Sequence, residues 1–183
     1  MAVVKRVLFF LSLALLVSPL FYNFAFATVI HVPADQTTIQ AGIDAAVNGD
    51  TVLVADGTYI GTGNREIVYN GKSILVKSER GADSCIIDCQ GLGGGFVFRS
   101  NETSDAILNG FTIMNGSTSY GGAIQSNLGS YPTIKYCIFR SNTAIYGGAF
   151  FADNNSNNRI IDCQFYGNSA STGGAIHLQS VAT

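Results

Sequence analysis

The chain has 183 residues, of which 47% are hydrophobic and only 12% are charged, and it contains 21 glycines and no tryptophan. This length suits one domain, and the hydrophobic content is high enough to bury a core, so an intrinsically disordered chain is excluded. Ten Lys and Arg against twelve Asp and Glu give a net charge of −2. The chain therefore lacks the basic character of proteins that bind nucleic acid or anionic lipid.

Residues 1–27 have the pattern of a secretory signal peptide. Lys5 and Arg6 form the positive N-terminal region, residues 7–17 form an unbroken apolar run, and Ala25-Phe26-Ala27 is a small-residue cleavage site. We expect cleavage between Ala27 and Thr28, which removes two bases and leaves a mature chain of net charge −4. An uncleaved membrane anchor is the alternative. No later segment has the length of a transmembrane helix, so we expect no membrane span in the mature chain.

The region that follows, residues 28–50, predicts an N-terminal cap. Residues 37–40 (Thr-Thr-Ile-Gln) match a helix capping box, and apolar residues follow at helical spacing up to Asn48-Gly49, which ends the helix. An open solenoid end exposes unpaired strand edges, so an amphipathic helix over 38–47 is expected to cover it. Strands are expected at 52–54 and 73–77, where the winding begins.

An internal repeat with a constant period occupies the rest of the chain. Gly-Gly-Ala occurs at 121–123, 147–149 and 173–175, and Asn142 and Asn168 have the same separation. The string Ile-Ile-Asp-Cys-Gln occurs at 86–90 and again at 160–164, which is slightly less than three full periods later. This distance predicts a first coil that is shorter than the period, followed by two coils of full length.

The composition of the repeat identifies its architecture. Each unit is rich in Gly, Asn, Ser and β-branched or aromatic residues, without an apolar stripe at helical spacing, which excludes helical repeats. Leucine is scarce after the signal segment, which excludes leucine-rich repeats. Each unit instead contains short apolar strands separated by polar turns, as in one coil of a parallel β-helix. We therefore expect an all-β solenoid with its coils over residues 51–183.

Stacked coils place equivalent residues in ladders about 4.8 Å apart, and the apolar ladders form the core. Four core ladders are predicted: Ile86, Leu108, Ile134 and Ile160; Cys89, Phe111, Cys137 and Cys163; Ile113, Phe139 and Phe165; and Val97, Ile124, Phe150 and Ile176. The turn positions are expected to be the glycine pairs and the asparagines: Gly121, Gly122, Gly147, Gly148, Gly173, Gly174, Asn142 and Asn168.

The chain stops at Thr183, a few residues after the third Gly-Gly-Ala strand. We expect this to be the N-terminal part of a longer protein that supplies further coils or domains. The alternative is a short solenoid whose open end is closed by self-association or by a partner.

Two segments resemble known β-helix families. The Gly-Gly-Ala-Ile/Phe strands at 121–124, 147–150 and 173–176, with Phe139 and Asn142 in one coil and Phe165 and Asn168 in the next, resemble the GGA(I/L/V) and FxxN repeats of chlamydial-type polymorphic outer-membrane proteins. Residues 32–46 and 50–59 are similar to the opening of pectin-lyase-like proteins. Both resemblances imply a right-handed parallel β-helix. They say little about activity, because such folds occur in lyases, hydrolases, esterases and non-catalytic adhesins.

The four cysteines are interpreted as packing residues. An even cysteine count in an exported chain is compatible with disulfides. However, Cys89, Cys137 and Cys163 share a predicted inward ladder with Phe111, which favours buried free thiols, with a strained Cys137–Cys163 bridge as the alternative. The state of Cys85 stays open as well. No Cys or His pair has the spacing of metal ligands, so neither a metal nor a cofactor is expected.

Candidate catalytic groups do not form a cluster in the sequence. Asp88 and Asp162 occupy the same predicted position of the repeat but lie three coils apart, roughly 14 Å, beyond the ~5–9.5 Å of paired catalytic carboxylates. His177 alternates with Ile176 and Leu178 and is expected to point outward, in phase with Gln125 and Phe151. We therefore assign no catalytic residue.

The interpretation favoured by these observations is an exported, non-catalytic β-helix repeat domain of a bacterial cell-surface or secreted protein, similar to a stalk or adhesin. Its partner would be a host-surface or cell-wall glycan or protein, and it would be found outside the cell or at the outer-membrane surface. The alternative is a polysaccharide-active enzyme of the pectate lyase, polygalacturonase or pectin esterase type. That alternative requires two or three Asp and an Arg on neighbouring coils, or a catalytic face in a missing C-terminal part.

Overall fold

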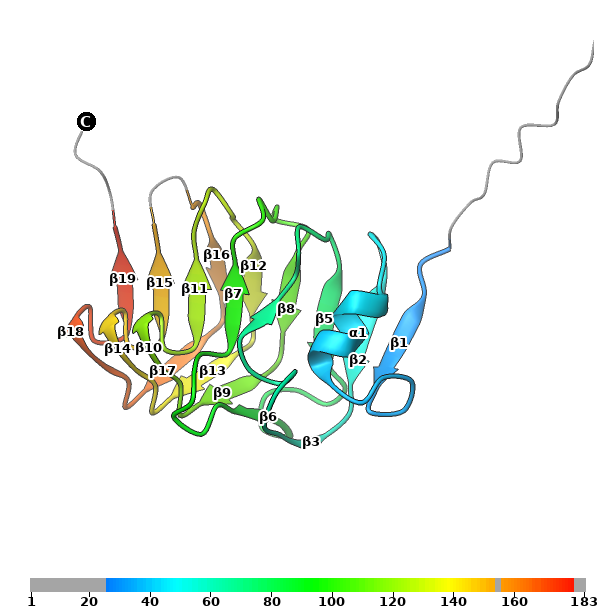
Figure 1. The fold of residues 1–183 in the computed structure, drawn as a ribbon, viewed down its shortest axis with the longest axis horizontal. Coiled ribbons are helices and arrows are strands. Elements are labelled where there is room, and N and C mark those ends of the chain that lie inside the picture. The colour runs from blue at the N-terminus through cyan, green and yellow to red at the C-terminus, as the bar shows by residue number, and fades with distance from the viewer. Residues whose placement is uncertain (1–25, 154–155, 180–183) are drawn as a thin grey trace, which may run out of the picture.

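The computed structural model describes residues 26–153 and 156–179, and these residues form a solenoid of stacked parallel strands (Figure 1). The N-terminal coil lies at one end of the solenoid and the Gly-Gly-Ala repeats lie at the other. The all-β parallel β-helix expected from the repeat is confirmed. The predicted signal peptide falls largely on residues 1–25, outside the described residues, and stays a prediction.

Four parallel sheets run along the solenoid, and each coil contributes one strand to each sheet that it reaches. Sheet 1 contains β1 (Val29–Val32), β2 (Thr51–Val54), β5 (Leu75–Ser78), β8 (Ile107–Asn109), β12 (Thr133–Lys135) and β16 (Arg159–Ile161). Sheet 2 contains β3 (Gly57–Tyr59), β6 (Cys85–Asp88), β9 (Thr112–Met114), β13 (Ile138–Arg140) and β17 (Gln164–Tyr166). Sheet 3 contains β4 (Ile67–Val68), β7 (Phe96–Phe98), β11 (Ile124–Ser126), β15 (Phe150–Ala152) and β19 (Ile176–Leu178). Sheet 4 contains β10 (Ser117–Tyr120), β14 (Thr143–Tyr146) and β18 (Ser169–Thr172).

The N-terminal helix α1 spans Ile39–Ala45, inside the predicted 38–47. Its N-cap is Thr38, whose hydroxyl accepts a hydrogen bond from the backbone N–H of Ala41 at 3.2 Å. The N-cap is therefore Thr38 and not Thr37, and the capping box predicted at 37–40 does not form. The side chain of Gln40 instead bonds the backbone N–H and carbonyl of Val68.

The helix packs against β1, β2 and β4. Ile39 and Ile43 are fully buried, and a Cβ at Gly42 would lie 2.8 Å from the side chain of Val52, so this face of the helix lies tightly against the first coils. The sequence did not indicate β1. That strand lies inside the region expected to form the cap, and it pairs with β2 as the edge of sheet 1.

The strand registers define the core ladders, and they correct three of the predicted members. Leu108 pairs with Ile134 and Ile134 with Ile160, but the partner of Leu108 on its other side is Val76, not Ile86. Ile86 belongs to sheet 2, where it pairs with Thr112.

Cys89 and Val97 are also misplaced in the predicted ladders. Cys89 follows β6, and its N–H bonds the carbonyl of Met114, whereas the register of β6 on β9 brings Cys85 opposite Phe111. In sheet 3, Ile124 pairs with Phe96, and Val97 pairs with the outward-facing Gln125.

These errors have one cause, which is the repeated string Ile-Ile-Asp-Cys-Gln. Its first copy lies in β6 of sheet 2 and its second copy begins in β16 of sheet 1, so the two copies are not structural equivalents. The short first coil predicted from this string is therefore wrong. The coil at this place is as long as the later ones or longer, since Leu75 pairs with Ile107 in sheet 1, Ile86 with Thr112 in sheet 2 and Phe96 with Ile124 in sheet 3.

The buried carboxylate of Glu102 holds the longer loop of this coil in place. Its side chain accepts hydrogen bonds from the N–H of Gly71 (3.0 Å), the N–H of Ser100 (2.9 Å) and the hydroxyl of Ser130 (2.7 Å). Glu102 is only 1% exposed, so three consecutive coils converge on one buried acceptor.

The core is a continuous column of aliphatic and aromatic side chains. Tyr69 and Phe98 pack at 4.8 Å between ring centroids, and Phe139 stacks on Phe165 at 5.0 Å. Burial decreases in the last described coil, where Ile176 is 38% exposed while its ladder neighbours Ile124 and Phe150 are fully buried. The strands of this coil are the edge strands of their sheets within the described residues.

Candidate functional site

The asparagine and glycine positions singled out in the sequence lie at the two ends of sheet 4. Asn142 follows β13 and is fully buried. Its side-chain oxygen accepts a hydrogen bond from the N–H of Gly116 at 2.8 Å, and its amide donates to the carbonyl of Ile113 at 3.0 Å. Asn168, one coil later, donates to the carbonyl of Phe139 at 2.9 Å. Asn142 thus pairs the N–H of Gly116 at the turn, and both asparagine amides donate to carbonyl groups of strand residues, Ile113 in β9 and Phe139 in β13.

The glycine pairs form the sharp turn from sheet 4 to sheet 3. The first glycine of each pair has positive φ, 59° at Gly121, 65° at Gly147 and 66° at Gly173. The second glycine lies against the next coil, so that a Cβ at Gly122 would be 2.3 Å from the carbonyl oxygen of Gly148. These repeat positions are occupied by residues that make the turns and allow close stacking.

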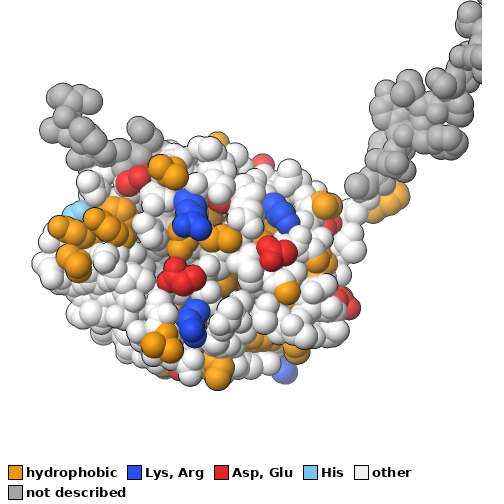
Figure 2. All heavy atoms as spheres, viewed as in Figure 1, with side chains coloured by type: hydrophobic (Ala, Val, Ile, Leu, Met, Phe, Trp, Pro, Cys, Tyr) orange, Lys and Arg blue, Asp and Glu red, His pale blue; other side chains and the backbone are white. Residues whose placement is uncertain are grey.

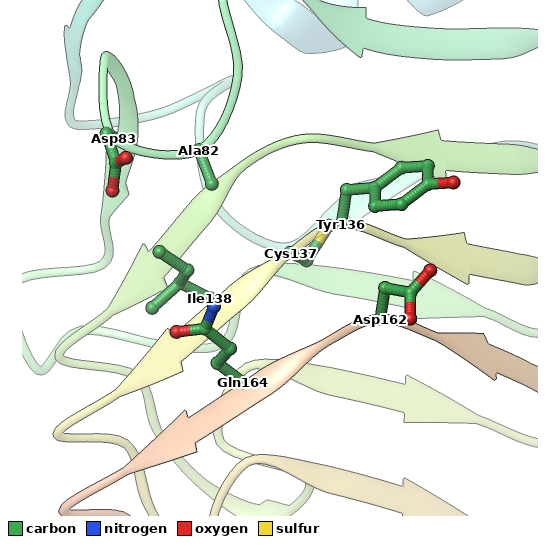
Figure 3. Close-up of a pocket in the computed structure, with 7 residues that line it drawn as sticks. All are labelled: Ala82, Asp83, Tyr136, Cys137, Ile138, Asp162 and Gln164. Atoms are coloured by element: carbon green, nitrogen blue, oxygen red, sulfur yellow. The ribbon is translucent and has the colours of Figure 1, made fainter.

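A pocket of about 420 Å³ opens at the corner between sheets 1 and 2 (Figure 3). We call it the corner pocket, and its lining consists of Ala82, Asp83, Tyr136, Cys137, Ile138, Asp162 and Gln164. Tyr136 and Asp162 lie next to each other on neighbouring coils, and Asp83 lies at the far end of the pocket on the loop before β6. Among the described residues, two carboxylates and no Lys or Arg line this pocket, so it does not suit an anionic polyuronate.

Two residues of the corner pocket have a left-handed backbone conformation, which the turn at this corner explains. Tyr136 and Asp162 have φ of 55° and 49°, and Gly110 occupies the same corner one coil earlier with φ of 80°. The N–H of Gly110 bonds the carbonyl of Lys135, and the N–H of Tyr136 bonds that of Ile161, so the three residues are stacked. The left-handed conformation therefore belongs to the corner itself and recurs whatever the side chain.

The two aspartates considered as a catalytic pair do not occupy equivalent positions. Asp88 lies on the outer face of β6 and pairs with Met114, whereas Asp162 lies at the corner before β17. The predicted shared position of Asp88 and Asp162 is therefore wrong. It followed from the same repeated string that displaced Ile86 and Cys89.

His177 lies on the outer face of sheet 3, as its alternation with apolar neighbours predicted. It pairs with Phe151, which pairs with Gln125. The other histidine, His31, forms an exposed contact with Asp35 at 3.1 Å near the N-terminal end. Among residues 26–153 and 156–179, no group of three or more His, Cys, Asp or Glu side chains is arranged to hold a metal ion.

All four cysteines are free thiols, three of them buried and Cys163 half-buried. Burial raises the pKa of Cys85 and of Cys89 to about 12. Cys137 and Cys163 lie together on neighbouring coils, in one ladder with Cys85 and Phe111. The adjacent Cys137 thiol lowers the pKa of Cys163 below its ordinary value, whereas full burial keeps the pKa of Cys137 well above it. Within this pair, Cys163 is the thiol that ionises first.

Within the described part of the chain, no helix combines the length and apolar character required to cross a membrane.

Comparison with known proteins gives one match. Searches of curated proteins and of solved structures found no significant similarity. Residues 162–179 match the family model described as the Chlamydia polymorphic membrane protein repeat. The matched segment is the last described coil, from the Asp162 corner through β17, β18 and β19. This coil, with Asn168 and the Gly173-Gly174 turn at its centre, is similar to a repeat of that polymorphic membrane protein family.

Proposed function

We propose that this chain is an exported, non-catalytic β-helix repeat domain that is displayed at a bacterial cell surface as a stalk or adhesin-like module. The observation that carries this proposal is the match of residues 162–179 to a repeat of membrane proteins. The predicted signal peptide, with cleavage after Ala27, supports export.

The structural roles of the matched residues support a non-catalytic repeat. Asn168 and its equivalent Asn142 satisfy backbone groups between coils, and the glycine pairs allow neighbouring coils to approach closely. The recurring residues thus extend a rod rather than assemble a reaction centre. A rod built from stacked coils holds its outer faces away from whatever anchors it, which suits a surface module.

The experiment is to locate the native product and test its exposure. An antibody raised against the full chain is used to blot culture medium, cell envelope and cytosol, and intact cells are treated with proteinase K before blotting. We expect the protein in the envelope or medium, with the envelope form digested on intact cells while a cytosolic marker survives. Recovery only in the cytosol would contradict the proposal.

A second measurement tests whether the chain is non-catalytic. The purified chain is incubated with polygalacturonate and with methyl-esterified pectin, and unsaturated products, reducing ends and methanol are measured. We expect no release above that of a heat-denatured sample. Release of any of these products would instead favour the polysaccharide-active alternative.

A further inference from the structure

A groove with a regular pattern of side chains runs along the solenoid where sheet 4 turns into sheet 3. It encloses about 300 Å³ and is lined by Tyr120, Gln125, Asn127, Phe151, Asp153 and Gln179. We call it the aromatic groove. Figure 2 shows hydrophobic side chains gathered over the C-terminal coils beside a histidine. The groove lies apart from the corner pocket, which opens between sheets 1 and 2.

Three rows of side chains, each with one member per coil, form the groove and its margins. Tyr120 pairs with Tyr146, and Tyr146 pairs with Thr172. On the outer face of sheet 3 the corresponding row is Gln125, Phe151 and His177. The N–H of Asp153 bonds the carbonyl of Ser126, and that of Gln179 bonds Ala152, so Asn127, Asp153 and Gln179 form the third row. The rows repeat along the solenoid axis at about the 4.8 Å spacing of adjacent strands.

The two tyrosine rings are exposed, Phe151 beneath them is buried, and the rings hold one another in place. Tyr120 and Tyr146 are 41% and 36% exposed, and their rings stack at 5.4 Å with an interplanar angle of 15°. Tyr120 also packs edge-on against Phe151 at 4.9 Å, and Phe151 stacks on His177 at 5.7 Å. This packing fixes the tyrosines before any ligand arrives, which lowers the entropic cost of binding.

The polar groups of the groove are mainly neutral amides. Gln125 and Gln179 each carry a donor and an acceptor, and neither side chain forms a hydrogen bond to another described residue. The amide oxygen of Asn127 is buried and has no hydrogen-bond partner among the described residues. The one carboxylate, Asp153, is engaged by the N–H of Leu128 at 3.1 Å and by the hydroxyl of Ser156 at 3.0 Å. None of the described residues that line the groove is Lys or Arg.

These features match the chemistry of an uncharged sugar chain. A pyranose ring has an apolar C–H face that packs on an aromatic ring and a rim of hydroxyls that both donate and accept, as side-chain amides do. Because each coil adds one member to each row, a linear chain lying along the axis meets a further side chain of every row at each coil, and the tyrosine recurs at Tyr120 and Tyr146. A peptide bound by strand addition needs a free sheet edge, but the groove lies on sheet faces whose backbone groups are paired within the sheets.

We propose that the aromatic groove binds a linear, uncharged oligosaccharide, with Tyr120 and Tyr146 as the packing platform and the amides of Gln125 and Gln179 as the hydroxyl contacts. The biological role of this binding rests on the proposed surface function, because an oligosaccharide is the class of partner that the displayed domain would bind. The binding itself is a property of the folded chain and is measured separately.

The test is isothermal titration of the full chain with cellohexaose, xylohexaose and chitohexaose as neutral probes and hexagalacturonate as the anionic one. We expect at least one neutral probe to bind and hexagalacturonate not to bind. Tyr120→Ala and Tyr146→Ala should each weaken binding about tenfold, while Tyr146→Phe keeps most of the affinity. Tyr166→Ala is the matched control, because Tyr166 is 56% exposed on sheet 2. It should bind like the unmodified chain.

Equal melting temperatures show that the variants are folded, and shifts of the tyrosine ring proton signals on titration show whether the rings touch the probe. The inference is overturned if no neutral probe binds, if only hexagalacturonate binds, or if Tyr166→Ala loses as much affinity as Tyr146→Ala. If the chain is found at the cell surface but binds no oligosaccharide, the proposed function stands and the proposed binding by the aromatic groove fails. If the chain is found only in the cytosol but binds an oligosaccharide, the binding stands and the proposed function fails.

Discussion

The side-chain oxygen of Asn168 accepts two hydrogen bonds from Asn142 of the neighbouring coil, one from its backbone N–H and one from its amide group, both at 3.0 Å. The side-chain oxygen of Asn142 in turn accepts a hydrogen bond from the backbone N–H of Gly116, one coil earlier. The turn between sheets 2 and 4 is thus held by a chain of side-chain amides that runs along the solenoid.

Replacing Asn142 by alanine should therefore destabilise the fold by about 3 kcal/mol, because it leaves the N–H of Gly116 buried without a partner and removes the amide hydrogen bonds to Ile113 and Asn168. Asn168→Ala should cost about 1 kcal/mol, since Asn168 is only half-buried. Urea unfolding followed by circular dichroism measures both values. Equal costs for the two variants would contradict the ranking by burial.

The glycine turns offer a comparison at one repeat position. A Cβ at Gly148 would lie 2.1 Å from the carbonyl oxygen of Gly174, whereas a Cβ at Gly174 meets no described atom within 4 Å. Gly148→Ala should lower the free energy of unfolding by about 3 kcal/mol. Gly174→Ala should change it by less than about 1 kcal/mol. Thermal melting of both variants checks this, and a large loss for Gly174→Ala would contradict the open space found beside Gly174.

Phe139 lies at the centre of the sheet 2 ladder, between Ile113 and Phe165, and is fully buried. Phe139→Asp should abolish folding, because the aspartate would be an unpaired charge in an apolar core. Phe139→Leu keeps the apolar character and should cost about 1–2 kcal/mol. The far-ultraviolet circular dichroism spectrum and the melting curve report the outcome. A native spectrum for Phe139→Asp would refute the ladder.

Glu102 should be required for stability although its polar side chain is buried in the solenoid. Glu102→Ala removes the acceptor shared by Gly71, Ser100 and Ser130 and should cost about 3 kcal/mol. The control is Glu79→Ala, because Glu79 is exposed, and it should stay within about 0.5 kcal/mol of the unmodified chain. Limited proteolysis provides a second measurement, since Glu102→Ala should make residues 99–106 sensitive to cleavage.

Cys163 should be the first thiol to react with iodoacetamide in the folded protein. Its pKa is lowered by the adjacent Cys137 thiol, so its reactive thiolate forms at a lower pH than that of an ordinary cysteine. The labelling rate should therefore rise with pH and level off below pH 9, the ordinary value of a thiol. Cys85 and Cys89, with pKa near 12, should react only after unfolding.

Mass spectrometry of peptides identifies the labelled cysteine, and Cys163→Ser should remove the fast phase. A fast phase that persists in Cys163→Ser would place the reactive thiol elsewhere. A mass two hydrogens lower than that of the four-thiol chain would instead indicate the Cys137–Cys163 bridge that the sequence left open.

The parallel β-helix can be predicted from the repeat alone, because the regular spacing of glycine and asparagine is imposed by turns that repeat once per coil. The sequence also determined that His177 faces outward, since strand alternation is a local property. It did not determine which coil segments pair. Ile-Ile-Asp-Cys-Gln has the same apolar alternation in sheet 2 and in sheet 1, so only the tertiary register assigns Ile86 to Thr112 and Cys85 to Phe111.

The aromatic groove was also decided by tertiary structure alone. Tyr120 and Phe151 belong to different sheets and different coils, so no spacing in the sequence brings them together. Their rings meet because the Gly121 and Gly147 turns fold sheet 4 against sheet 3. Local sequence patterns predict on which face of a sheet a side chain lies. The contacts between different sheets depend on the angles of the turns and on the register of neighbouring coils, which exist only in the folded chain.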